Sequence, residues 1–180
     1  MRTSVLSLLS GLWLSAAVLA VPVAARAAPA DDAHNSLPNG LSALARLLIG
    51  VADGRPTGLT AVTRLTGTSP TTDLALGNAC REVTRAGPFL LDTATRLEGC
   101  RGEHGKRVVF HLSLFRFDAS REGTAAFMAS ARPALVRGIC RNPDVPVLGR
   151  LGIALIFQYT GINQQPVGEV SISPGGCDSA

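Results

Sequence analysis

The sequence has few aromatic residues and almost no lysine. Phe, Tyr and Trp make up 4% of its 180 residues, and Lys106 is the single lysine beside sixteen arginines. Proteins that bind nucleic acids gather basic side chains next to aromatic residues that stack on bases. Here the arginines are spread along the chain. The composition therefore argues against a nucleic-acid partner, although the formal net charge is +4.

The sequence also lacks the short motifs that carry catalytic or cofactor chemistry. It has no G-x-S-x-G nucleophile elbow and no H-E-x-x-H zinc helix. The glycines around Lys106 match a phosphate loop poorly, and a hairpin turn explains them better. His104 falls in a turn and His111 within a strand, so both fit solvated or structural histidines. We expect no catalytic residue, cofactor or metal. An unrecognised hydrolase stays an alternative, which a polar pocket with a shifted histidine or carboxylate would favour.

The four cysteines lie far apart in the sequence. No C-x-x-C pair exists, so the spacing argues against a zinc site and against redox exchange. An even number of cysteines in an exported chain indicates disulfides. Of the three possible connectivities we favour Cys140 with Cys177, which would join a helix to the last strand, and Cys80 with Cys100, which would join the first helix to the first strand.

The N-terminus has the three parts of a secretory signal. Arg2 supplies a positive charge, an apolar run extends from Val5 to Val21, and an A-x-A site ends at Ala27. We expect residues 1–27 to be removed, and an uncleaved anchor is the alternative. No cysteine is available there to carry a lipid. Cleavage leaves a charge of about +2, and no later run is long and apolar enough to span a bilayer. The mature protein is therefore expected to be soluble, in the periplasm or secreted.

Residues 28–72 have the composition of a linker, rich in Ala, Gly, Pro, Thr and Asp. One apolar stretch, residues 41–51, has helical spacing. It could dock on the following domain or on a partner, or it could remain a loosely held helix.

Residues 73–180 show the pattern of one small α+β domain. A helix begins near Asp73, capped by Thr72 or Asp73, and stops at Pro88. Leu90 to Leu97 leads into an extended segment that ends at Gly99 and Cys100. After a glycine-containing turn, residues 108–115 alternate as a half-buried strand does. A helix follows at residues 125–140, where Pro133 should bend or divide it.

A second pair of strands follows the second helix. Leu151 to Tyr159 has the pattern of a strand, a turn follows at Gly161–Gln164, and Val167 to Ser173 returns. The order helix, strand, strand, helix, strand, strand predicts a four-stranded antiparallel sheet with helices on one face.

The C-terminal half resembles a known group of exported proteins. The motifs are Ile139–Pro143, Leu151–Tyr159, Gly168–Val170 with Cys177, and the upstream segment 87–97. Together they are similar to the sheet-containing pilotins of type II secretion and to the quorum-sensing-regulated virulence factor family. The resemblance covers residues 74–180 and implies their fold. Unlike pilotins, this chain has no cysteine for lipidation, and it has a long N-terminal extension and two further cysteines.

These observations predict a non-enzymatic accessory or protein-binding module of the cell envelope. A peptide partner would bind the sheet face left open by the helices, or an exposed strand edge. From the alternation of side chains along the strands, five residues are candidates to line that face: His111, Arg116, Gln158, Tyr159 and Glu169. The same face could equally be an ordinary solvated surface. A secreted virulence-associated factor or enzyme inhibitor is the alternative.

Overall fold

The computed structural model describes residues 39–57, 68–120 and 123–177. The predicted signal peptide, residues 1–27, lies outside the described residues, so its cleavage stays a prediction. In the described ranges no helix is long and apolar enough to cross a membrane.

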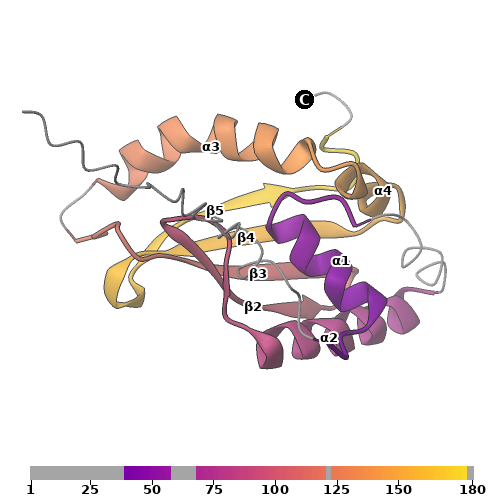
Figure 1. Cartoon of the computed structure of the whole chain (residues 1–180). Coiled ribbons are helices and arrows are strands. Elements are labelled where there is room, and N and C mark those ends of the chain that lie inside the picture. Colours follow the sequence, from indigo (N-terminus) through magenta and orange to yellow (C-terminus); the bar gives the residue numbers. More distant parts are fainter. Residues whose placement is uncertain (1–38, 58–67, 121–122, 178–180) are drawn as a thin grey trace, which may run out of the picture.

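The described residues form one sheet with its helices on a single side (Figure 1). The helices are α1 (Ala43–Ala52), α2 (Ser69–Ala86), α3 (Thr124–Cys140) and α4 (Asp144–Arg150). The strands are β1 (Phe89–Leu90), β2 (Thr95–Glu103), β3 (Arg107–Leu114), β4 (Ala154–Thr160) and β5 (Pro166–Ile172), with a short 3-10 turn, η2 (Ile162–Gln164), before β5. The α+β class is confirmed.

The sheet itself differs from the expectation. It has five strands in the order β1-β2-β3-β4-β5, and β3 pairs with β4 in parallel, so the prediction of four antiparallel strands is wrong. The reason lies in the connection. Helices α3 and α4 carry the chain back along the sheet before β4 starts, and such a crossover joins parallel strands. The sequence pattern gives no helix for residues 144–150 and no separate strand for residues 89–90.

Alternation along the strands places the core on the helix side. Val108, Phe110 and Leu112 of β3 are buried there beside Leu155 and Phe157 of β4. The rings of Phe110 and Phe157 stack with centroids 4.9 Å apart. The predicted apolar face of residues 108–112 is therefore confirmed, and the opposite parity forms the other face of the sheet.

Helix α1 belongs to this core, although the sequence analysis had placed it in a linker. Leu47 and Leu48 are fully buried in the same cluster as the strands. The Asn142 side-chain amide donates to the carbonyls of Gly50 and Arg55, both at 3.1 Å, and so holds the end of α1. The buried core therefore includes residues from Leu41 onward, and the docking of residues 41–51 on the following domain is the alternative that the structure has.

Helix α2 begins earlier than expected, at Ser69 after Thr68. Thr72 and Asp73 thus lie inside the helix, so the prediction that one of them caps it is wrong. Asp73 instead accepts hydrogen bonds from the backbone N–H groups of Gly105 and Lys106, at 3.1 and 2.7 Å. It joins α2 to the turn between β2 and β3, which is the hairpin expected around Lys106.

Helix α2 packs directly on the edge of β2, along a contact that we call the α2–β2 seam (Gly77, Cys80 and Thr84 against Gly99, Cys100 and Gly102). A Cβ atom on Gly102 would lie 2.6 Å from the backbone nitrogen of Gly77. The Thr84 hydroxyl accepts from the Cys100 N–H and donates to its carbonyl, both at 3.1 Å. A disulfide joins Cys80 to Cys100. The seam thus replaces a neighbouring strand along this part of β2.

The second disulfide joins Cys140 at the end of α3 to Cys177, so the structure has the connectivity that the sequence analysis favoured. All four cysteines are paired. Helix α3 is one helix with Pro133 inside it, not two. It packs on β5, where Met128 fills the space above Gly168.

Replacing Leu48 by alanine tests whether α1 is part of the core. We expect the free energy of unfolding to fall by about 2–5 kcal/mol, because the side chain is completely buried. Arg46→Ala on the exposed side of the same helix should change it by less than about 0.5 kcal/mol. Urea denaturation measures both. Equal effects would show that α1 is not packed as described.

Gly102→Ala tests the α2–β2 seam. The added methyl group would meet the backbone of α2, so we expect a loss of about 1–3 kcal/mol in unfolding free energy. Gly138→Ala is the control, because nothing lies within 4 Å of its added Cβ and alanine favours a helix by about 0.5–1 kcal/mol. The two variants should shift the thermal midpoint in opposite directions, and a neutral Gly102→Ala would contradict the seam.

Candidate functional site

The sheet face opposite the helices carries a long groove. It consists of two adjoining hollows of about 660 and 580 Å³ that share Glu98 and His111. We call this the open-face groove. At one end it reaches the seam and the arginines of α2 and β2, and at the other the loop after β4. Its lining residues outside the seam are Arg81, Arg85, Arg96, Arg101, Ser113, Phe115, Thr160, Gly161, Ile162, Asn163 and Gln164.

Three of the five nominated residues lie in one row across the open face. His111, Gln158 and Glu169 are register partners on β3, β4 and β5. The Gln158 side-chain amide donates to a Glu169 carboxylate oxygen at 3.2 Å. Of the three, only His111 lines the groove.

The other two nominated residues lie elsewhere. Tyr159 has the parity of Leu155 and Phe157, and it is buried on the helix side, so its assignment to the open face is wrong. Arg116 follows the end of β3 and is exposed, but it is not part of the sheet.

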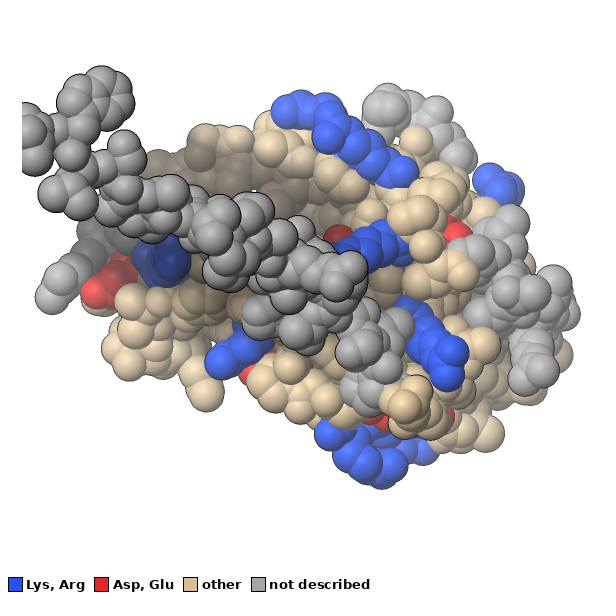
Figure 2. Space-filling view, in the orientation of Figure 1, with Lys and Arg blue, Asp and Glu red and all other residues tan. Residues whose placement is uncertain are grey.

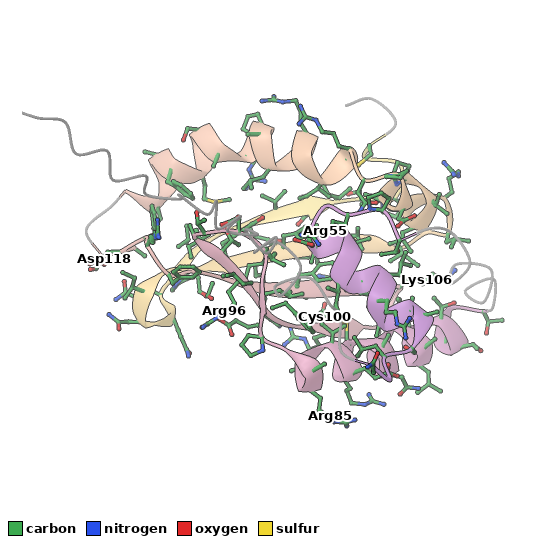
Figure 3. The ribbon with its side chains drawn as sticks, viewed as in Figure 1. Arg55, Arg85, Arg96, Cys100, Lys106 and Asp118 are labelled. Atoms are coloured by element: carbon green, nitrogen blue, oxygen red, sulfur yellow. A yellow bond between two sulfur atoms is a disulfide. The ribbon has the colours of Figure 1, made fainter. Side chains whose placement is uncertain are left out.

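A bulge in β2 supplies the carboxylate in the middle of the groove. The register between β2 and β3 shifts between Leu97 and Gly99, so Glu98 is the extra residue. Arg96 donates to Glu98 through Nε at 2.8 Å and Nη2 at 2.7 Å, and the Ser113 hydroxyl also donates to it. Figure 3 shows Arg96 on the same strand as Cys100. The charge of Glu98 is therefore already paired.

His111 lies between this carboxylate and the arginine end. Burial lowers its pKa from 6.5, the nearby charge of Arg101 lowers the pKa further, and Glu103 opposes the shift. These surroundings favour the neutral form of the imidazole. Within the described ranges no carboxylate lies at salt-bridge distance from it.

The far end of the groove is apolar. Phe115 and Ile162 are each 40% exposed, which is high for large hydrophobic side chains. The Ile162 N–H donates to the Phe117 carbonyl at 2.8 Å, which fixes the loop. Asn163 and Gln164 follow with φ of 60° and 59°, a left-handed conformation that is uncommon outside glycine. The loop is thus held in one shape beside the groove.

A separate hollow of about 380 Å³ lies on the helix side, between α1, α3 and the sheet. Burial raises the pKa of Asp53 there, and burial with the Asp92 charge raises the pKa of Tyr159 to about 12. Asp53 pairs with Arg55 at 2.7 Å, and Asp92 accepts from two backbone N–H groups. The shifted carboxyl group and the shifted His111 are on opposite faces of the sheet. They cannot act on the same substrate.

No group of three metal-ligating side chains comes together in the residues that the structure covers. Both disulfides remove the cysteines as ligands. Sequence reasoning missed the arginine end of the groove. The R-x-x-x-R spacing of Arg81 and Arg85 was a usable signal, because residues four apart share a helix face.

No protein-family model matches this sequence, and neither does any curated protein. Solved structures do match. A protein of Pseudomonas aeruginosa described as secreted aligns over 61% of this chain and 95% of its own, with a TM-score of 0.50 and 21% identity. The chain has the fold of this secreted protein. At this level of identity the likeness concerns the fold alone.

Two pilotins of type II secretion systems also match. EpsS of Vibrio vulnificus is 12% identical with a TM-score of 0.48, and AspS of Vibrio cholerae is 16% identical with a TM-score of 0.45. Each match spans 61% of this chain and 94% of the pilotin. The solved structures that match thus include pilotins, one of the groups that the sequence motifs resemble.

Titration of His111 tests the electrostatics of the groove. We expect its pKa, measured by NMR, to lie below 6.5. The unfolded chain then binds a proton more readily than the folded protein, so the free energy of unfolding should fall as the pH drops below 6.5. Arg101→Gln should move the pKa upward, because it removes a neighbouring positive charge and leaves Glu103 paired with Arg107 alone. Arg150→Gln on α4 should leave it unchanged. A pKa above 6.5 in the native protein would contradict the described surroundings.

Proposed function

We propose that this chain is an exported, non-enzymatic protein-binding module of the cell envelope, which holds a segment of a partner protein in the open-face groove. The observation that carries the proposal is the groove itself. It runs along the sheet face that carries His111, α2 borders one end of it, and it joins an apolar end to a charged end. Concave surfaces that combine apolar contacts with a few placed polar groups are typical of binding sites.

The side chains of the groove favour binding over catalysis. A nucleophilic mechanism needs a nucleophile within hydrogen-bond reach of a base that is itself oriented by a third group. His111 makes no such contact among the described residues, and the Ser113 hydroxyl donates to Glu98, which Arg96 neutralises. The proposal therefore assigns no catalytic role to these residues.

The strand edges support a face-binding mode rather than strand addition. Most of the outer edge of β2 is covered, by β1 and by the α2–β2 seam. At the edge of β5, Arg132 of α3 donates to the Glu169 carbonyl at 2.8 Å. A peptide strand would have to displace this contact, whereas the groove needs no displacement.

The compartment follows from the chemistry of the cysteines. Two disulfides fit an oxidising compartment. With the signal sequence predicted at residues 1–27, this supports the periplasm as the place of action. A secreted factor or inhibitor, the second candidate, would use the same groove after release and is supported by the likeness to a secreted protein.

Photocrosslinking in cells tests this function. A photoreactive residue at Gln164, exposed at the groove, should give discrete adducts with an envelope protein, whereas one at the exposed Ser130 on α3 should not. Adducts from both positions alike, or from neither, would contradict the proposal.

Blotting periplasm, membranes and medium locates the protein. Processed protein in the periplasm supports the envelope module, protein in the medium supports the secreted factor, and unprocessed protein in the membrane argues against both.

A further inference from the structure

Two arginines of α2 point to a more specific ligand. Arg81 and Arg85 lie one helical turn apart and line the same hollow as Arg101 of β2. In the part of the chain that the structure describes, neither Arg81 nor Arg85 has a carboxylate within 4.0 Å. Like charges four residues apart destabilise a helix slightly. The partial negative charge at the C-terminus of α2 stabilises the positive charge of Arg85, but Arg81 lies too far from that end of the helix.

The carboxylates around this hollow are already engaged. Glu98 is paired with Arg96, and Glu103 is shared by Arg101 at 2.8 Å and Arg107 at 3.4 Å. Glu82 of α2 interacts with the charge of Arg85 and accepts a hydrogen bond from the Ser42 N–H at 2.7 Å. Five arginines thus surround three carboxylates, and the region keeps a net positive charge. Figure 2 shows basic side chains gathered at the lower edge of the molecule, where Figure 1 has α2, and Figure 3 shows Arg85 extending there.

The floor of the hollow is the α2–β2 seam itself. Gly77, Gly99 and Gly102 lie there with the Cys80–Cys100 disulfide, and the close packing of α2 on β2 brings Arg81 and Arg85 to the same hollow as Arg101. Arg81 also donates from Nη2 to the Asn78 side-chain oxygen, which orients its guanidinium. Guanidinium groups bind carboxylates with two parallel hydrogen bonds.

We propose that Arg81, Arg85 and Arg101 form a carboxylate-binding end of the open-face groove, so that the partner segment is an acidic peptide. The inference rests on the proposed function and names the chemistry of the ligand. The groove continues from the arginines past His111 to Phe115 and Ile162. The segment therefore carries acidic residues at one end and a large apolar residue at the other. A free anion would use only the arginine end.

Binding of synthetic peptides tests the inference. The probes are an eight-residue peptide with one phenylalanine and three glutamates at opposite ends, and the same peptide with glutamines in place of the glutamates. We expect the purified native protein to bind the glutamate peptide at least about tenfold more tightly, because hydrogen bonds between a guanidinium and a carboxylate are stronger than those to a neutral amide. Amide shifts in NMR should change at Gly99 and Gly102 and at Ile162.

Matched arginine variants locate the effect. R81Q/R85Q should weaken binding of the glutamate peptide about tenfold or more, R81K/R85K should restore part of it, and R137Q/R141Q at the end of α3 should change nothing. Circular dichroism confirms that each variant is folded. Equal binding of both peptides, or equal effects of the two glutamine pairs, would overturn the acidic ligand. Arginine-dependent binding of inorganic phosphate or phosphatidylglycerol vesicles, without peptide binding, would overturn it in favour of a phosphate ligand.

The two proposals can fail separately. Loss of the Gln164 adducts in cells carrying R81Q/R85Q supports the acidic ligand. Undiminished adducts overturn the acidic ligand and leave the protein-binding function standing. Absence of adducts in the native protein overturns the function itself.

Discussion

The close contact between α2 and β2 is the constraint on which the rest of the structure depends. Two glycines, Gly77 and Gly102, let the helix backbone meet the strand, and Thr84 hydrogen-bonds both backbone groups of Cys100. The contact closes one edge of the sheet, and the Cys80–Cys100 disulfide fixes it covalently. It also turns one side of α2 toward the open face. The packing that completes the core thereby brings Arg81 and Arg85 next to Arg101.

Local patterns predicted the elements but not their pairing. Period-two alternation located β3 and β4, helical spacing located α3, and cysteines at element ends indicated both disulfides. Strand direction depends on where the chain returns after a connection, and α4, with Pro146 inside it, resembles a turn in sequence. Whether α1 docks on the domain stayed open in the sequence for a related reason. An amphipathic helix is the same in sequence whether or not a groove in the fold receives it, and here Leu47 and Leu48 fill the core.

The candidate site shows the same division between local and tertiary information. Strand parity placed His111, Gln158 and Glu169 correctly on one face. Tyr159 failed the same rule, because its parity with Phe157 assigns it to the core. The arginines could not be combined from the sequence, since they come from a helix and a strand that meet only through the α2–β2 seam. The close approach of this helix and this strand depends on glycines, and in the sequence alone these glycines resemble those of turns.

Both ends of the groove are held in place by the fold, and this affects the free energy of binding. The groups at the charged end project from α2 and β2, which are joined by a disulfide, and the loop at the apolar end is held by the Ile162–Phe117 hydrogen bond. A ligand would therefore meet side chains that are already in place, and little conformational entropy would be lost from the protein. The charged residues keep the empty groove hydrated, whereas Phe115 and Ile162 alone would favour self-association. Under the proposed function, a mixed groove on a rigid sheet would thus stay hydrated while empty and still select among partner segments.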